Sequence, residues 1–258
     1  MLDIHTTAVV HPRAEIDSDV TIGPYAVIGP NVQIGSGTVV ASHVVVDGNT
    51  RIGRNNRIHA HSTIGGDPQD LKFRGEKTYL LIGNNNTIRE SVTMNVASIE
   101  GESTVVGDHC LFMTNAHVAH NCTVADHSIL ANGVSLGGHA DIGEHAIIGG
   151  HTAVHQFVRV GCFSIVGGCY RTVQDVMPFM MVAGYPLRLT GLNAIGLERN
   201  GFDEERRRSL KRAYRILVRS NLNLSQATAR LRSDFGSENE DIRMLVEFIE
   251  SSERGVIT

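Results

Sequence analysis

The sequence lacks tryptophan, and its aromatic residues make up only 5% of the chain. This argues against a core built around large rings, whereas 27 glycines among 258 residues favour a fold with many tight turns. The four cysteines, Cys110, Cys122, Cys162 and Cys169, show no CxxC pair and no zinc-ligand spacing. We therefore predict four buried thiols rather than disulfides.

Long apolar runs are also missing. No window reaches the roughly 18 apolar residues that a membrane span needs, and the start, MLDIHTTAVV, lacks the basic and apolar segments of a secretion signal. The formal net charge of −4 argues against a nucleic acid partner. The chain is therefore predicted to be cytoplasmic, with no stable membrane insertion.

What the sequence does contain is an aliphatic residue at every sixth position. The first column reads Ile4, Val10, Ile16, Ile22, Ile28, Ile34, Val40, Val46, Ile52, Ile58 and Ile64, and a second runs from Val106 to Val166. A fixed short period marks a stacked repeat, in which each coil buries its apolar row against the coils on either side. Residues 1–190 are predicted to form a left-handed parallel β-helix of hexapeptide repeats, which makes the fold mainly β.

The repeat breaks twice and then ends. Residues 65–81 and 95–105 do not follow the period, so we expect them to be loops expelled from the coil, and such loops on a rigid scaffold commonly carry function. Residues 191–258 are predicted to form a small helical domain. Its main helix begins after Asp203, with shorter helices over 224–233 and 240–251.

Three hexapeptides per turn make residues 18 positions apart neighbours in adjacent coils. His120, Gly138 and Gln156 then form one stripe. A general base needs an imidazole, a group that fixes its tautomer and a backbone N–H for the oxyanion. His120 with Gly138 can meet these needs, and Asp70 in the first expelled loop is a possible orienting group.

These residues also allow a structural or a different chemical interpretation. Most of the 13 histidines are expected to be polar surface positions of the coil, and the cluster around His117, His120 and His139 is a weak candidate for a metal site, because no carboxylate or thiolate completes the ligand set. Cys122 is a chemical rival as an acylated nucleophile, but it has no clear base and its coil position points inward.

Positive charge is concentrated near the C terminus. Residues 1–190 hold 11 basic and 16 acidic residues, whereas residues 191–258 hold 12 and 11. The cations crowd one predicted helix and include Arg206, Arg207, Arg208, Lys211, Arg212 and Arg215. A solvated helix face would explain them, but such a patch would also attract an acidic protein or a phosphate.

Several motifs, in order along the whole chain, resemble one family. They are QDLKF at 69–73, IRESVT at 88–93, NAHVAHNCTV at 115–124, TAVHQF at 152–157, VGGC at 166–169 and RNGF at 199–202. Together they resemble the UDP-N-acetylglucosamine 3-O-acyltransferases of lipid A biosynthesis. The resemblance implies an enzyme that moves an (R)-3-hydroxyacyl chain from acyl carrier protein onto the 3-position of this UDP-amino sugar. It also implies a homotrimer with sites between neighbouring coils.

The resemblance further implies a role for individual residues. The sugar hydroxyl would attack the thioester directly, with His120 as general base, Gly138 as oxyanion donor and Asp70 holding His120 or the sugar. No metal or cofactor would take part, since the chain arrives on the phosphopantetheine of the carrier protein. The implied substrate contacts are Gln69, Lys72, His117, His139, His155, Gln156, Gly168, Asn193 and Arg199. The basic helix would bind the carrier protein, and Gly168 would leave room for about fourteen acyl carbons rather than ten.

The chain departs from the family pattern near the acceptor. Asn95-Val96-Ala97 replaces the usual His-Arg-Gly, Ile195 stands in place of an acidic residue, and Asn200 in place of a second arginine. A 3-amino analogue of the sugar, giving an amide product, is therefore a second candidate acceptor. The sequence is also compatible with another hexapeptide-repeat sugar acyltransferase, with a trimeric scaffold that lacks catalysis, and with a γ-class carbonic anhydrase, which would need bound zinc.

Overall fold

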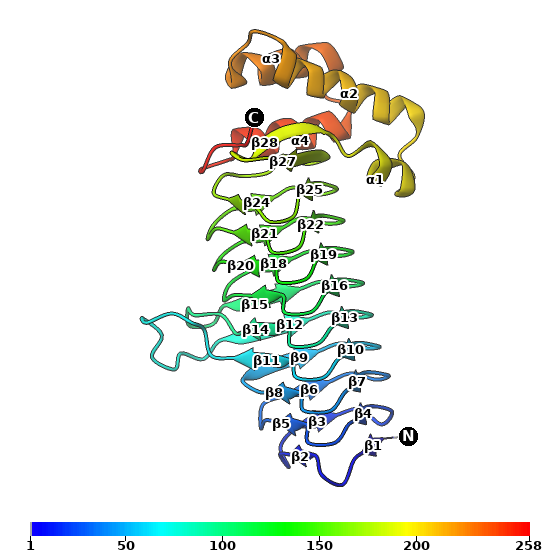
Figure 1. Cartoon of the computed structure of the whole chain (residues 1–258), viewed down its shortest axis with the longest axis vertical. Coiled ribbons are helices and arrows are strands. Elements are labelled where there is room, and N and C mark those ends of the chain that lie inside the picture. Colours follow the sequence, from blue (N-terminus) through cyan, green and yellow to red (C-terminus); the bar gives the residue numbers. More distant parts are fainter. Residues whose placement is uncertain (1) are drawn as a thin grey trace.

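Each hexapeptide forms one short strand and one corner, so the chain coils into a three-sided prism. The computed structural model describes residues 2–258, and Figure 1 shows the coil as a column with the N terminus at one end and four helices at the other. Along the coil, each strand pairs in parallel with the strand one turn further on, as in His117 with Ser135, 18 residues apart. The predicted β-helix is confirmed.

The prism has sheets of eleven, nine and eight strands. The eleven-stranded sheet contains β1 (Asp3–Ile4), β4 (Thr21–Ile22), β7 (Val39–Val40), β10 (Arg57–Ile58), β13 (Thr87–Ile88), β16 (Leu111–Phe112), β19 (Ile129–Leu130), β22 (Ile147–Ile148), β25 (Ile165–Val166), β27 (Met180–Ala183) and β28 (Arg188–Leu192). The nine-stranded sheet contains β2 (Val9–Val10), β5 (Val27–Ile28), β8 (Val45–Val46), β11 (Thr63–Gly66), β14 (Thr93–Asn95), β17 (His117–Val118), β20 (Ser135–Leu136), β23 (Ala153–Val154) and β26 (Arg171–Thr172). The eight-stranded sheet contains β3 (Glu15–Ile16), β6 (Gln33–Ile34), β9 (Asn49–Ile52), β12 (Tyr79–Ile82), β15 (Ser103–Val106), β18 (Thr123–Val124), β21 (Asp141–Ile142) and β24 (Arg159–Val160).

The sixth-position aliphatic residues fill the prism axis. Ile22, Ile64 and Leu130 have at most 1% of their surface exposed. Ile4 is 38% exposed because its coil is the first and has no coil beneath it. The column predicted from the sequence is therefore buried everywhere except at this open end.

The corners of the prism explain many of the histidines. Within residues 2–258, seventeen residues other than glycine have a left-handed backbone, and these lie at corners, where an imidazole can stack on the next coil. His109, His127 and His145 form such a ladder, with ring centroids 4.9 and 4.5 Å apart and planes 3° from parallel. Most of these rings are therefore corner packing, as the sequence suggested for the majority of histidines.

Both expelled loops leave the corner between the nine- and eight-stranded sheets and project to the same side of the column (Figure 1). They span residues 67–78 and 96–102, which is shorter than predicted at each end. The difference arises because β12 and β15 are four residues long and pair in register over their full length. Leu80 and Thr104 occupy additional inward positions there.

The C-terminal helices stack on the last coils. They are α1 (Ala194–Arg199), α2 (Glu204–Arg219), α3 (Leu224–Phe235) and α4 (Glu240–Glu250). Asp203 caps α2 by accepting a hydrogen bond from the Arg206 N–H, as its sequence predicted. The short helix α1 was not predicted from the sequence. The expected boundary at residues 190 and 191 falls within β28, because this antiparallel strand still belongs to the coil sheet.

Candidate active site

His120 lies at the corner between the nine- and eight-stranded sheets, directly after β17, and its ring covers Gly138 on the next coil. A Cβ placed on Gly138 would come within 2.5 Å of His120 Cε1 and 2.6 Å of Nε2. A glycine is therefore needed for the ring to lie there. Within residues 2–258 the Gly138 N–H has no hydrogen-bond acceptor, so it is free to bind an oxyanion.

The other ring nitrogen of His120 is held by groups that the sequence analysis did not identify. Asn121 Oδ1 lies 2.8 Å and Ser98 Oγ 3.1 Å from His120 Nδ1. The orientation of the Asn121 amide is fixed, since its Nδ2 donates to Glu102 at 2.6 Å and its Oδ1 accepts from the Ser98 N–H at 3.0 Å. An amide oxygen only accepts, so Nδ1 carries the proton and Nε2, beside Gly138, has the free lone pair.

Two further imidazoles surround His120. His117 Nδ1 lies 2.7 Å from Thr93 Oγ1, and His139 contacts His120 edge-on with ring centroids 5.3 Å apart. Burial lowers the pKa of His117, and the neighbouring His120 lowers it further. Burial and His120 also lower the pKa of His139, against an opposing effect of Glu102 and Asp70. His117 and His139 therefore favour the neutral form, which adds no positive charge beside His120.

The first expelled loop carries three of the predicted residues. Gln69 and Lys72 are exposed, and the Asp70 carboxylate accepts a hydrogen bond from the Lys72 N–H at 2.9 Å. Among the described residues Asp70 makes no hydrogen bond to His120, whose Nδ1 is held by Asn121 and Ser98 instead. Asp70 is nevertheless close enough to His139 for its charge to raise the pKa of that ring. The role of Asp70 stays a prediction.

The stripe continues away from the loops through Gln156 and His155. The Gln156 backbone N would lie 2.8 Å from a Cβ on Gly137, which shows how closely these coils stack. The sequence therefore placed His120, Gly138 and Gln156 correctly as neighbours on successive coils. Gly168 is exposed beyond them, at a different corner, and a Cβ there would meet the Gly150 carbonyl oxygen at 3.1 Å.

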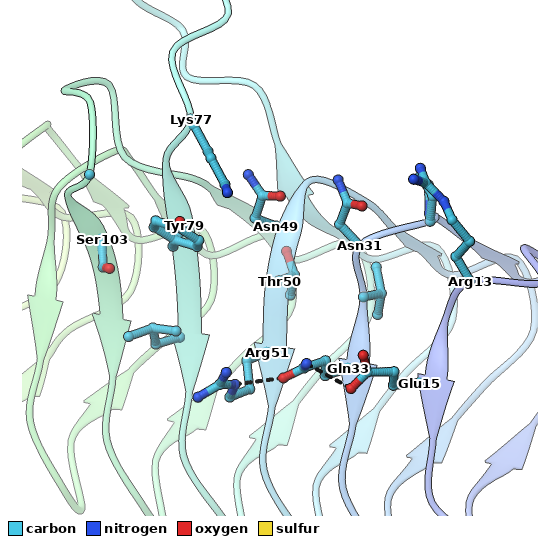
Figure 2. Close-up of a pocket in the computed structure, with 14 residues that line it drawn as sticks. Arg13, Glu15, Asn31, Gln33, Asn49, Thr50, Arg51, Lys77, Tyr79 and Ser103 are labelled. Carbon is cyan, nitrogen blue, oxygen red and sulfur yellow. Dashed lines mark hydrogen bonds between the residues drawn. The ribbon is translucent and has the colours of Figure 1, made fainter.

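A separate groove of about 680 Å³ lies on the other side of the expelled loops, over β3, β6, β9 and β12. Figure 2 shows Arg13, Asn31, Asn49 and Lys77 along one rim, and a chain of hydrogen bonds from Arg51 through Gln33 to Glu15 along the other. Its lining contains no histidine. The polar side chains of the groove can hold a polar ligand, but the groove has no imidazole that could accept a proton as His120 can.

Comparisons with known proteins show which family this chain resembles. A family model described as UDP-N-acetylglucosamine O-acyltransferase, domain 2, matches residues 175–257, and the bacterial transferase hexapeptide model matches 13–48 and 103–138. A Paracidovorax citrulli protein called acyl-[acyl-carrier-protein]–UDP-N-acetylglucosamine O-acyltransferase is 52% identical over 99% of both chains. A Paraburkholderia phymatum protein of the same name is 44% identical over the full length of both. The chain belongs to this acyltransferase family.

Solved structures of the family have the same fold. LpxA from Acinetobacter baumannii superposes with a TM-score of 0.94 at 42% identity and 99% coverage of both chains. LpxA from Bacteroides fragilis gives 0.95 at 36% identity, covering 98% of this chain and 99% of the other. Because the matched region includes the helical segment, this chain shares both the coil and its helices with these structures.

Four of the five residues that depart from the family pattern are packed or hydrogen-bonded within the chain. Asn95, Val96 and Ala97 are buried, and Asn95 Nδ2 donates to the Asp67 carbonyl oxygen at 2.8 Å. Asn95 therefore connects the base of the second expelled loop to the start of the first. Asn200 donates from Nδ2 to the Gly196 carbonyl oxygen at 2.8 Å, and Ile195 is exposed on α1.

The two family contacts predicted on α1 differ in accessibility. Asn193 is buried and caps α1, with Oδ1 accepting from the Gly196 N–H and Nδ2 donating to the Phe163 carbonyl oxygen. Arg199 is exposed in the last turn. The geometry therefore favours a structural role for Asn193 and leaves Arg199 accessible to a ligand.

The six predicted carrier-binding residues of α2 divide into three groups. Arg206 pairs with the buried Asp241 of α4 through two hydrogen bonds of 2.8 and 2.9 Å, and Arg212 pairs with Asp234 of α3 at 2.8 Å. These two hold the helices together. Arg207 and Arg208 make ion pairs with glutamates, whereas Lys211 and Arg215 are exposed and make no ion pair within residues 2–258.

The cysteine prediction was wrong in part. Cys110 and Cys122 are buried, but Cys162 is half-buried and Cys169 is exposed at a corner where its backbone φ is +64°. Burial raises the pKa of Cys122 to about 12, which disfavours a thiolate nucleophile.

No three His, Cys, Asp or Glu side chains gather as a metal site in the described chain. No helix between residues 2 and 258 has the length and apolar character to cross a bilayer.

Proposed function

We propose that this protein transfers an (R)-3-hydroxyacyl chain from acyl carrier protein to the 3-hydroxyl of UDP-N-acetylglucosamine, the first step of lipid A biosynthesis. The proposal rests on the His120–Gly138 pair. The lone pair of His120 Nε2 lies beside the Gly138 N–H, which has no acceptor within residues 2–258. The substrates are those named for the relatives that are 44 and 52% identical to this chain.

In the proposed reaction His120 Nε2 accepts the proton of the sugar hydroxyl as the oxygen attacks the thioester carbonyl carbon. The Gly138 N–H stabilises the tetrahedral oxyanion, and the C–S bond then breaks. The phosphopantetheine thiolate takes the proton back from His120 as it leaves. No acyl-enzyme forms, and no metal or cofactor takes part.

The carrier protein is proposed to bind α2. Carrier proteins that deliver acyl chains here are acidic, and Arg207, Arg208 and Lys211 line a depression of about 420 Å³ beside Leu192 and Ala194. With Arg215, this depression presents positive charge at the helical end of the coil. Arg206 and Arg212 contribute less to binding in this proposal, because their guanidinium groups are paired with Asp241 and Asp234. Arg207 and Arg208 are also partly neutralised, by Glu198 and by Glu204, which lines the depression, so Lys211 and Arg215 supply most of its net positive charge.

Function is proposed to need a cytoplasmic homotrimer. On the eleven-stranded sheet the outward positions of the upper coils are apolar and half-buried, namely Leu111, Ile129, Ile147, Ile165 and Met181. The eight-stranded sheet presents Thr123, Asp141 and Arg159 at its outward positions. An apolar stripe on one face only favours packing against a second copy of the chain.

The 3-amino analogue of the sugar is the second candidate acceptor. Asn95 occupies the place of the family histidine, and its Oδ1 is buried without a hydrogen-bond partner among the described residues. A hydroxyl and an amine can both donate to this oxygen, so the second candidate rests on the absence of the family's imidazole and cation at residues 95 and 96. In this case the amine attacks the same carbonyl carbon and an amide forms.

The test is acyl transfer from (R)-3-hydroxymyristoyl carrier protein to UDP-N-acetylglucosamine and to its 3-amino analogue, with acetyl-coenzyme A as the comparison donor. We expect transfer to the hydroxyl acceptor from the carrier protein alone. Faster transfer to the amine would move the assignment to the second candidate. Transfer from acetyl-coenzyme A alone would contradict the carrier protein as donor.

Lys211→Glu with Arg215→Glu tests carrier binding in the same assay. Reversing two unpaired charges should raise KM for the acylated carrier about tenfold at low salt, with less effect at high salt, and leave the sugar KM unchanged. Arg230→Glu, on the neighbouring α3, is the control, since Arg230 lies outside the depression. Equal effects of both changes would contradict a docking surface on α2.

A further inference from the structure

The C-terminal segment after α4 returns to the coil and is fixed there. The Asp175 backbone exchanges two hydrogen bonds with it, donating to the Gly255 carbonyl oxygen and accepting from the Ile257 N–H, both at 2.9 Å. The Asp175 side chain, which is 1% exposed, also accepts from Ser252 Oγ at 2.8 Å. Val256 and Ile257 are buried. The segment is therefore held on both sides of Arg254.

Arg254 is thereby placed against His155. Its Nε donates to the Val173 carbonyl oxygen at 3.0 Å, and Val173 lies one coil beyond His155 in the β23–β26 register. Its Nη2 lies 3.3 Å from His155 Nδ1. A residue from the last five positions of the chain thus contacts the stripe that begins at His120.

This contact selects the tautomer of His155. A guanidinium can only donate, so the contact forms only when His155 Nδ1 is unprotonated. The Gln156 carbonyl oxygen, 3.2 Å from the same nitrogen, would favour the opposite tautomer. The charge-assisted bond is the stronger of the two, so the proton belongs on Nε2. Within residues 2–258 Nε2 has no hydrogen-bond partner, which leaves it available to a ligand.

We propose that Arg254 is a positioning residue for acyl transfer, which holds His155 as an Nε2–H donor toward the substrate. The proposal depends on the proposed function, in which His155 contacts the substrate. It goes beyond that function because it makes the C-terminal segment part of the active site. Arg254 itself need not touch either substrate.

The kinetic test compares Arg254→Ala, Arg254→Lys, His155→Ala and the double variant in the full assembly. Arg254→Ala should lower kcat/KM about tenfold, in the range of one hydrogen bond to a charged group, and lysine should restore part of it. The double variant should lose no more than His155→Ala alone, because Arg254 acts through His155. Arg243→Ala on α4, whose ion pairs are only 4.0 Å contacts, is the matched control and should have no effect.

A spectroscopic measurement tests the geometry without activity. In the ¹⁵N-histidine-labelled protein, the His155 signals should report an Nε2-protonated neutral ring, and Arg254→Ala should shift the ring toward the Nδ1-protonated form. An Nδ1-protonated ring in the parent would overturn the proposal, as would additive losses in the double variant. If the parent transferred no acyl chain, the proposed function would fail while the tautomer measurement still decided the contact.

Discussion

The coils below and above the expelled loops share one strand register but differ at one corner, where Asn121, His139 and Phe157 of the upper coils have a left-handed backbone and Arg13 and Asn31 of the lower coils do not. Strand register makes His120, Gly138 and Gln156 equivalent to Pro12, Pro30 and Gly48 of the lower coils. The fold therefore accepts proline and glycine at this corner, and packing does not require an imidazole there. The difference fits the proposal that the polar side chains of the upper corner serve acyl transfer.

His120→Ala should produce the largest effect. Loss of the general base should lower kcat by about 100-fold or more, while the thermal unfolding midpoint changes little because the ring is only half-buried. Acyl transfer and thermal unfolding are measured side by side. A variant with parental activity would place the base elsewhere.

The control for this change comes from the lower coils. His43 is an exposed corner residue whose ring stacks on that of His61 and lies tilted against that of Tyr25, so His43→Ala should leave transfer unchanged. If both alanine variants lost activity equally, the difference between the lower and upper coils would be unrelated to acyl transfer.

Gly138→Ala should come next. The new Cβ would overlap the His120 ring, so the ring must rotate away from the oxyanion site, and we expect kcat to fall at least tenfold with the fold intact. The transfer rate measures the fall in kcat, and circular dichroism shows whether the fold is intact. Gly191→Ala is the control, because a Cβ on Gly191 meets no atom within 4 Å. Full activity in Gly138→Ala would show that the ring position is not critical.

The sequence predicted the stripe because its spacing is set by backbone geometry. A period of 18 residues fixes His120 beside Gly138 whatever the side chains are. It could not predict the Ser98, Asn121 and Glu102 network, since Ser98 and Glu102 belong to an expelled loop whose path no period describes. Arg254 was missed for the same reason, as its contact spans 99 residues.

Stability below neutral pH should depend on the upper corner. The folded pKa of His117 is lowered from 6.5, so between that lowered value and 6.5 the unfolded chain binds more protons than the folded one. Its contribution to stability is therefore complete above pH 6.5 and is lost as the pH falls through the folded pKa. His117→Gln should make the unfolding midpoint less sensitive to pH between about 8 and about 5. An unchanged pH profile would contradict the buried, neutral ring.

The smallest effect is expected for Cys122→Ala. The equivalent inward positions of other coils hold Ala14, Val32, Thr50 and Leu80, so packing at this place does not require sulfur. With a buried thiol whose pKa is about 12, transfer should stay within about twofold of the parent, at a cost of about 1 kcal/mol in unfolding free energy. Loss of transfer at parental stability would instead indicate an acyl-enzyme on Cys122. In that case the chemistry would lie inside the prism, and the polar upper corner would serve binding alone.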